Sequence, residues 1–235
     1  MYYIGIDDTD VIGKPGTGRC ARNIVTVLST TCAILGVTRH QLFVSPTIPY
    51  TSHNSSAVIH VGTTHSEESI PELFNTVKET LQVHFMVGSD PGLVVVPRER
   101  VDSEIVNFGK RAKTEVLTKS EAFDLAQRKD ILLEGLGGTN DGVIGALAGV
   151  GLAATGEDGR FLLKGANRSA KGVLDVGTLL NAGIDEIATL DDVLVHAGFV
   201  DTLGKPPRPA FRRGKAVLYV EYDAERQLYL ALKTD

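Results

Sequence analysis

Apolar runs and amphipathic segments divide the first hundred residues into strands and helices. The pattern predicts six elements, in the order strand 2–7, helix 18–35, strand 41–46, strand 56–62, helix 67–84 and strand 92–97. This is the order of the split βαβ, ferredoxin-like unit, whose two helices cover one face of an antiparallel sheet. We therefore predict an α+β fold with a ferredoxin-like half over residues 1–100.

Beyond Pro97 the pattern changes and predicts a second mixed α/β subdomain over residues 101–235. A helix over 143–154 would be apolar on all sides, so it must be buried. Its small residues, Gly145 and Gly149 among them, favour close packing of this helix on a sheet. The other expected elements are helices 101–116, 119–129 and 176–181, strands 160–163 and 172–175, and a hairpin formed by 216–222 and 227–232.

Three carboxylates follow the first strand within four residues: Asp7, Asp8 and Asp10. Like charges this close repel one another unless a cation lies among them. Magnesium is the expected cation, because it takes oxygen ligands and is often shared between one or two carboxylates and a substrate phosphate. The three residues are therefore candidate metal ligands and catalytic groups. The alternative is a solvated turn whose Asp side chains cap the helix that follows.

A glycine-rich segment, residues 13–20, leads from these acids into the next predicted helix. Free N–H groups at a helix start bind anions without any special side chain. The glycine spacing comes near the P-loop pattern, but Arg19 and Cys20 stand where that motif needs Lys and then Ser or Thr. The residues expected to hold nucleotide phosphates here are Gly16, Thr17, Gly18 and Arg19.

A second glycine-rich loop, residues 135–142, precedes the buried helix. Its polar residues are good helix N-caps, so the loop is either a second anion site or the cap of a buried helix. Its candidate cofactor-binding residues are Gly137, Gly138, Thr139, Asn140 and Asp141.

A polar loop with two prolines, residues 46–55, joins two predicted strands. Loops held on a rigid scaffold commonly carry ligand-binding side chains. We expect Tyr50, His53 and Asn54 to contact the substrate.

Composition narrows the classes of protein. The formal net charge of −5 argues against a chain built chiefly to coat nucleic acid. No run approaches the roughly 20 apolar residues of a membrane span, and no charged leader precedes the first strand, so we expect a cytoplasmic protein without membrane contact. Cys20 and Cys32 are predicted on one helix, about 18 Å apart, which excludes a disulfide between them and a zinc site.

One segment is strongly basic. Residues 205–215 hold five basic residues, three prolines and no acid. This segment is either a solvated connector or a contact for phosphates or an RNA backbone. The sequence is also compatible with a homo-oligomer.

Four motifs occur in the same order as in the archaeal tRNA-Ile agmatinylcytidine synthetase family. They are residues 3–10 (YIGIDDTD), 46–50 (PTIPY), 89–92 (SDPG) and 142–151 (GVIGALAGVG). The chain resembles the N-terminal kinase-like catalytic region of that family over about residues 1–155. Four ordered motifs are more specific than any one of them.

The resemblance implies an enzyme that uses magnesium and ATP to phosphorylate a cytosine carbonyl oxygen, after which an amine displaces the phosphate. It implies that Asp7, Asp8 and Asp10 serve magnesium and ATP. The chain departs from the family where Ala21, rather than an autophosphorylated threonine, follows Cys20. It also resembles a stand-alone relative without the family's OB and zinc-ribbon modules, so tRNA is an open partner and the acceptor is a nucleobase or a small molecule.

Two other functions stay open at this point. One is a nucleotide-sensing module that binds Mg-ATP without turnover. The other is an accessory protein of RNA modification that would use residues 205–215.

Overall fold

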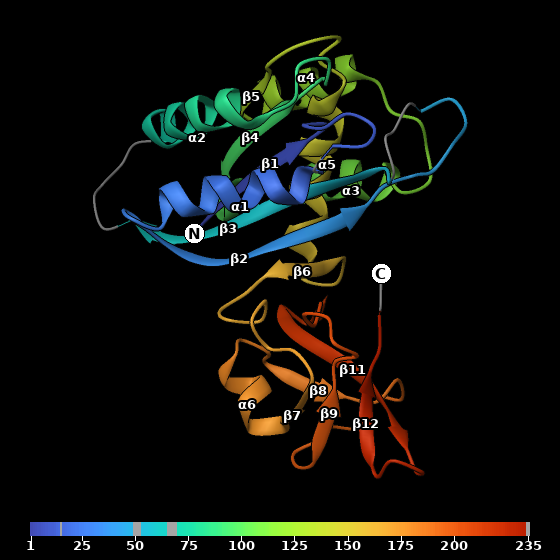
Figure 1. The fold of residues 1–235 in the computed structure, drawn as a ribbon. Coiled ribbons are helices and arrows are strands. Elements are labelled where there is room, and N and C mark those ends of the chain that lie inside the picture. The colour runs from blue at the N-terminus through green and yellow to red at the C-terminus, as the bar shows by residue number, and fades with distance from the viewer. Residues whose placement is uncertain (15, 49–52, 65–69, 234–235) are drawn as a thin grey trace. The chain divides into compact units, whose positions relative to one another are not determined.

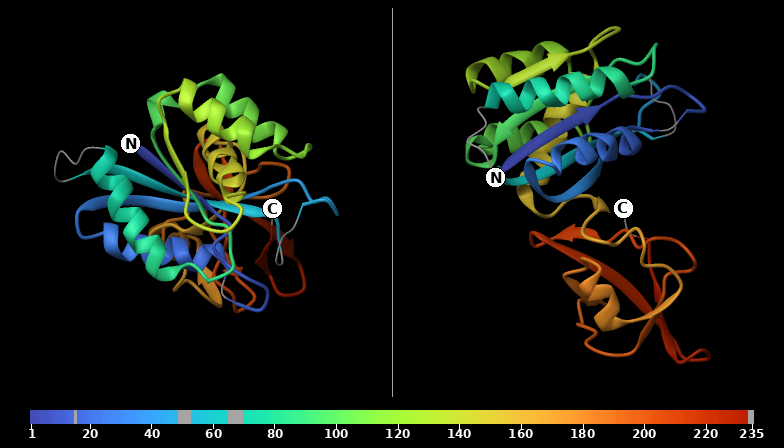
Figure 2. Two further views of the ribbon diagram at one scale, coloured as in Figure 1. Left: turned by 90° about the horizontal axis from the view of Figure 1, so that it is seen from above. Right: turned by 60° about the vertical axis from the view of Figure 1, so that its left-hand side comes forward.

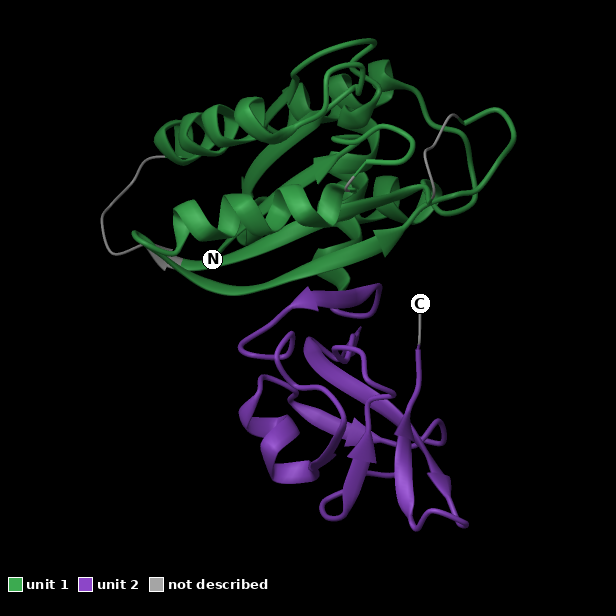
Figure 3. Cartoon of the chain, in the orientation of Figure 1, with its two compact units in different colours: residues 1–155 green, residues 156–235 purple. Residues whose placement is uncertain are grey.

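The computed structural model describes residues 1–14, 16–48, 53–64 and 70–233. The chain forms two compact units, residues 1–155 and 156–235 (Figures 1 and 3). The division therefore falls at Thr155 and not at the predicted boundary near residue 100, because the helix that ends there packs on the strands of the N-terminal sheet. Among the described residues, no helix has both the length and the apolar composition needed to cross a membrane.

Unit 1 is built on a five-stranded antiparallel sheet. Its strands are β1 (Tyr2–Asp7), β2 (Cys32–Gln41), β3 (Ser55–Thr64), β4 (Gly92–Pro97) and β5 (Leu132–Gly135). They lie in the order β5-β4-β1-β3-β2, and each neighbouring pair is antiparallel. With the helices α1 (Thr17–Leu28) and α2 (Ile70–His84), the element order through β4 is the β-α-β-β-α-β order expected from the sequence. The predicted α+β class is confirmed.

The first helix is shorter than predicted and the second strand begins earlier. Helix α1 ends at Leu28, where Ser29 Oγ donates to Val25 O and Thr30 Oγ1 donates to Val27 O at 2.8 Å. Hydroxyl side chains of this kind compete for backbone groups and favour helix ends. The apolar residues after them then pair with β3 instead of extending the helix. Strand β2 consequently covers 32–41, and the strand predicted at 41–46 is wrong.

Helices cover both faces of this sheet. Helices α1 and α2 pack together on one face, whereas α3 (Ser103–Arg111) and α5 (Gly142–Thr155) lie on the other (Figure 2). Helix α5 is buried along nearly its whole length, as its apolar composition predicts. Glycines allow its close approach, because a Cβ on Gly5 of β1 would lie 2.3 Å from Ala146 O. The short helix η1 (Arg98–Arg100) and helix α4 (Lys119–Arg128) complete the unit.

Unit 2 has its own sheet and core. Its elements are β6 (Arg160–Leu163), β7 (Val173–Asp175), α6 (Val176–Asn181), β8 (Glu186–Ala188), β9 (Phe199–Asp201), β10 (Ala210–Arg212), β11 (Lys215–Asp223) and β12 (Leu228–Ala231). The strands follow the order β6-β10-β11-β12-β9-β7, and β8 pairs with β11 in parallel. The predicted hairpin is the antiparallel pair β11 and β12. Apolar side chains from α6, β8 and β11 form the core.

The placement of the cysteines differs from the prediction. Cys20 lies on α1, but Cys32 is the first residue of β2, so the two are not on one helix. Both are buried, free thiols.

Candidate functional site

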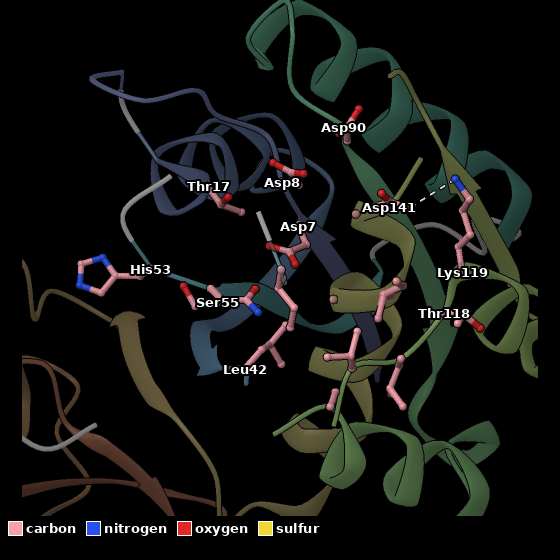
Figure 4. Close-up of a pocket in the computed structure, with 18 of the residues that line it drawn as sticks. Asp7, Asp8, Thr17, Leu42, His53, Ser55, Asp90, Thr118, Lys119 and Asp141 are labelled. Atoms are coloured by element: carbon pink, nitrogen blue, oxygen red, sulfur yellow. Dashed lines mark ion pairs between the residues drawn. The ribbon is translucent and has the colours of Figure 1, made fainter. Parts of the chain in front are cut away.

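Unit 1 contains a pocket of about 380 Å³ at the carboxyl end of β1 (Figure 4). One part of its wall is acidic and another is apolar. The carboxylates that line it are Asp7, Asp8, Asp10, Asp90, Glu115 and Asp141, and the apolar residues are Leu42, Ile48, Ala112, Val116, Leu117 and Ile144. The remaining lining residues are Thr17, Thr47, His53, Asn54, Ser55, Thr118, Lys119, Gly142 and Gly145.

The three acids predicted after the first strand all line this pocket. The pKa of Asp7 is raised to about 7, chiefly by burial and to a smaller extent by the negative charges of Asp8 and Asp10, while a hydrogen bond from the Asp8 backbone acts in the opposite direction. Burial is also the largest cause that raises the pKa of Asp8 to about 6, followed by the charges of Asp90, Asp10 and Asp141. Burial and neighbouring negative charges therefore both disfavour the ionised form of Asp7 and Asp8.

The first turns of helix α5 pack closely against the side chain of Asp7. A Cβ carbon on Gly145 would lie 1.7 Å from Asp7 Oδ2, and one on Gly142 would lie 2.3 Å from Asp90 O. Only glycine allows the helix backbone to come this close to the carboxylate. The sequence suggested close packing against a sheet at Gly145, and the structure shows that the close neighbour is the Asp7 side chain.

Asp10 has a structural role in addition to its place in the pocket wall. Its Oδ1 accepts hydrogen bonds from Thr17 N at 3.2 Å and from Thr17 Oγ1 at 3.1 Å, at the first residue of α1. This is the helix-capping alternative weighed in the sequence analysis. Of the four residues predicted to hold phosphates here, Thr17 lines the pocket, whereas Gly16, Gly18 and Arg19 do not.

The second glycine-rich loop holds the acidic wall in shape. Asp90 Oδ1 accepts from Thr139 N at 2.6 Å, so a carboxylate of the protein already occupies this amide of the predicted anion site. Lys119 Nζ contacts Thr139 O at 2.6 Å and Asp141 Oδ1 at 3.3 Å (Figure 4). Asp141 lines the pocket, while the other four predicted residues, Gly137, Gly138, Thr139 and Asn140, are not part of its lining.

Two of the three residues predicted to contact the substrate lie in the pocket wall. His53 and Asn54 line the pocket. Asn54 also has a structural contact, since its Nδ2 donates to Phe43 O at 2.7 Å and joins the residue before β3 to the segment that follows β2. Tyr50 lies outside the described residues.

Sequence reasoning did not select Asp90 or Lys119 as site residues. Asp90 could have been found from the sheet, because β4 pairs antiparallel with β1 and Asp7 faces Gly92, so residues just before β4 lie beside the end of β1. Lys119 carries no such signal. It is the first residue of α4, whose position depends on a capping box between Thr118 and Glu121 and on tertiary packing.

The carboxylate oxygens of the pocket suit a cation that prefers oxygen ligands and takes some of them from water or from a bound substrate. Among the residues that the structure describes, no three His, Cys, Asp or Glu side chains already form a metal-binding group. Magnesium needs only one or two carboxylates when waters and substrate phosphates complete its shell. The carboxylate oxygens of Asp7, Asp8 and Asp10 fit that requirement.

The solved structures that resemble this chain are those of a tRNA-labelling enzyme and a tRNA-modifying enzyme. The chain is 28% identical to a tRNA fluorescent labeling enzyme (TM-score 0.55) and 26% identical to apo TiaS, an isoleucine-tRNA agmatidine synthetase (TM-score 0.53). It is 27% identical to TiaS in complex with its isoleucine tRNA and ATP (TM-score 0.55). The chain resembles the tRNA-Ile agmatidine synthetases in structure as well as in motifs. The resemblance drawn from the four motifs is thereby confirmed.

The likeness to the TiaS structures is partial. It covers 64% of this chain and 35% or 36% of the three matched chains, so the chain spans about a third of their length. No protein-family model and no curated protein matches the chain.

Proposed function

We propose that this protein uses Mg-ATP to activate a carbonyl or amide oxygen, in a nucleobase or a small molecule, for attack by an amine. In the first step the acceptor oxygen attacks the γ-phosphorus of ATP and ADP leaves. In the second step the amine attacks the activated carbon and phosphate leaves. The observation that carries the proposal is the gathering of five aspartates, including Asp7, Asp8 and Asp90, around one pocket with an apolar wall.

The charge of the pocket explains why a divalent ion is needed. A triphosphate is an anion, and the clustered carboxylates would repel it at short range. Asp7, Asp8 and Asp10 would hold magnesium, which supplies charge neutralisation and binds phosphate oxygens. With the charges balanced, positioning of the acceptor supplies most of the remaining rate enhancement, as in other phosphoryl transfers.

The protein residues have separate tasks in this scheme. Asp7 and Asp8 present carboxylate oxygens from the end of β1. Thr17 places a helix start at the same pocket, where its N–H and hydroxyl meet Asp10. The apolar wall, which includes Leu42 and Ile144, would limit the access of water to the reacting groups.

The matched enzymes support the choice of substrates. One of the TiaS structures is a complex with an isoleucine tRNA and ATP, and another, 27% identical with a TM-score of 0.53, contains the tRNA, AMPCPP and agmatine. ATP and an amine are therefore the first ligands to test on this chain, and a cytosine-containing RNA is the first acceptor.

Thermal unfolding with ATP, magnesium or both tests binding, and release of ADP and phosphate tests turnover. Mg-ATP should raise the Tm, whereas ATP without magnesium should not, because a ligand specific for the folded state stabilises it by mass action. Asp8→Asn should lose the Mg-ATP effect and turnover. Asp8 has a φ of 51°, a conformation that Asn also tolerates, so this change removes charge without straining the backbone. Asp191→Asn, an exposed aspartate of unit 2, is the matched control.

An equal Tm shift in wild type and Asp8→Asn would refute the assignment of the acidic pocket. A magnesium-dependent shift without release of ADP or phosphate would instead identify a nucleotide-sensing module.

A further inference from the structure

The basic segment 205–215 is only partly available for binding an anion. Arg213 pairs with Glu186 at 3.1 Å and with Asp192 at 3.4 Å, and Lys215 also pairs with Glu186. Arg212 Nη1 donates to Phe211 O at 2.8 Å. The segment's other two cations, Lys205 and Arg208, are exposed and make no ion pair or side-chain hydrogen bond within the described part of the chain.

A second loop of unit 2 lies against this segment. Asn167 is fully buried, and its Nδ2 donates to Pro207 O at 3.1 Å. Gly172 N donates to Thr202 Oγ1 at 2.8 Å, and Thr202 N donates back to Gly172 O at 2.9 Å. Residues 164–172 and 202–208 therefore form two adjacent loops joined at both ends.

Besides Lys164, which pairs with Asp185, these two loops carry four cations. Arg168 follows Asn167, Lys171 precedes Gly172, and Arg208 follows Pro207, so each stands next to a residue that joins the loops. Lys205 closes the turn that begins at Thr202, through Lys205 N to Thr202 O at 3.1 Å. We call Arg168, Lys171, Lys205 and Arg208 the two-loop basic surface.

The two-loop basic surface lacks internal neutralisation. All four side chains are exposed, and within the described residues none of them makes an ion pair. Neither loop contains an acidic residue, and the acid just before the second loop, Asp201, pairs with Arg226 at 2.7 Å. Several other cations of unit 2 are paired, such as Lys164 with Asp185 and Arg213 with Glu186. Because four unpaired cations lie on adjacent loops, an anion with several charges would bind the two-loop basic surface more strongly than the rest of unit 2.

We propose that the two-loop basic surface binds the phosphate backbone of RNA. Cations spread over two loops are matched by a chain of phosphates and not by one free phosphate, and the two guanidinium groups can each grip a phosphate with two hydrogen bonds. A lipid surface is a poorer match, because the two loops expose one large apolar side chain, Leu203, for insertion. Binding through phosphates alone does not depend on base sequence.

Such binding has a characteristic dependence on salt. Four phosphate contacts to a single strand correspond to a slope of about −3 in log K against log salt concentration. Affinity should therefore fall by about 50-fold between about 50 mM and about 200 mM potassium chloride.

The test uses fluorescence anisotropy of the full chain with a labelled, unstructured uridine oligonucleotide of about 20 nucleotides, without ATP or magnesium. The double variant Lys205→Gln/Arg208→Gln should bind at least 10-fold more weakly at low salt and should reduce the slope by about 1.4. Arg168→Gln/Lys171→Gln should act in the same way. The matched control is Arg213→Gln/Lys215→Gln, which removes one Arg and one Lys from the same segment but takes them from existing ion pairs. It should leave affinity nearly unchanged.

Equal losses in all three double variants would overturn the proposal, since only overall charge would then matter. Binding to phosphatidylserine vesicles without binding to RNA would also overturn it. Asp8→Asn should bind the oligonucleotide like the wild type, so failure of the RNA surface and failure of the ATP site are told apart by separate measurements.

Discussion

The carboxylate of Asp7 occupies the space where a side chain at position 145 would begin. A Cβ built on Gly145 would lie 1.7 Å from Asp7 Oδ2, well inside van der Waals contact. The glycine is therefore required by the site and not only by the packing of α5 on the sheet. Gly145 belongs to the motif 142–151 and Asp7 to the motif 3–10, so residues far apart in the sequence form one local structure.

Gly145→Ala should displace the Asp7 carboxylate and abolish turnover of Mg-ATP. The forced shift should also cost about 1–3 kcal/mol of unfolding free energy, which the better helix propensity of alanine offsets only in part. Gly149→Ala is the control on the same helix, because its Cβ would meet Ser56 Oγ at 2.3 Å and leave Asp7 alone. Both variants should lose stability in urea titrations, but only Gly145→Ala should be inactive while folded. Full activity in Gly145→Ala would contradict the placement of Asp7.

Asp7→Asn should make the protein more stable at neutral pH while it removes activity. Burial raises the pKa of Asp7 from 3.8 to about 7, so the folded state prefers the protonated carboxyl group. The stability that protonation gives is complete below the unfolded pKa and is lost as pH rises through the folded pKa. Wild type should therefore lose more Tm than Asp7→Asn between about pH 4 and about pH 8. A parallel loss in both proteins would show that Asp7 is not the titrating group.

Local patterns predicted most of the fold of unit 1. The apolar runs of β1 and β4 are bounded by polar turns, so their ends agree with the predicted strands 2–7 and 92–97. Strand β2 was misplaced because the apolar residues after Thr31 also suit a continued helix, and only pairing with β3 decides between the two. The unit boundary was misplaced for a similar reason, since a pattern along the chain does not show which sheet covers the buried helix α5.

The site was predictable where its residues are neighbours in the sequence. Asp7, Asp8 and Asp10 stand together in one turn, and their charge density is visible in the sequence. Strand pairing places Asp90 beside the pocket, and helix packing places Lys119 there. These tertiary contacts are not visible in a single sequence, so neither residue is predicted from it. The sequence of the second glycine-rich loop suits either an anion site or a helix cap, and in the structure an acid distant in the sequence, Asp90, accepts from its Thr139 amide.

The two thiols should be unreactive in the folded protein. Cys20 is 5% exposed and Cys32 is 3% exposed, and burial raises the pKa of Cys20 to about 11. A thiol reacts as the thiolate and must be reachable. A chromogenic disulfide reagent at about pH 8 should therefore label neither cysteine quickly in the native state and both after denaturation. Fast labelling of one thiol in the native protein would show that α1 or β2 opens readily.

Asp90→Ala should loosen the glycine-rich loop and weaken nucleotide binding. Asp90 Oδ1 accepts a hydrogen bond from Thr139 N at 2.6 Å. Without this carboxylate, the contact of Lys119 with Thr139 O remains to hold the loop. Backbone amides of residues 136–141 should exchange with deuterium faster, and the KM for ATP should rise several-fold with a smaller change in kcat. Asp124→Ala, an exposed aspartate of α4, is the control and should change neither quantity. Unchanged exchange in Asp90→Ala would mean that the loop keeps its shape without the carboxylate, and Asp90 would then act on the cation and not on the loop.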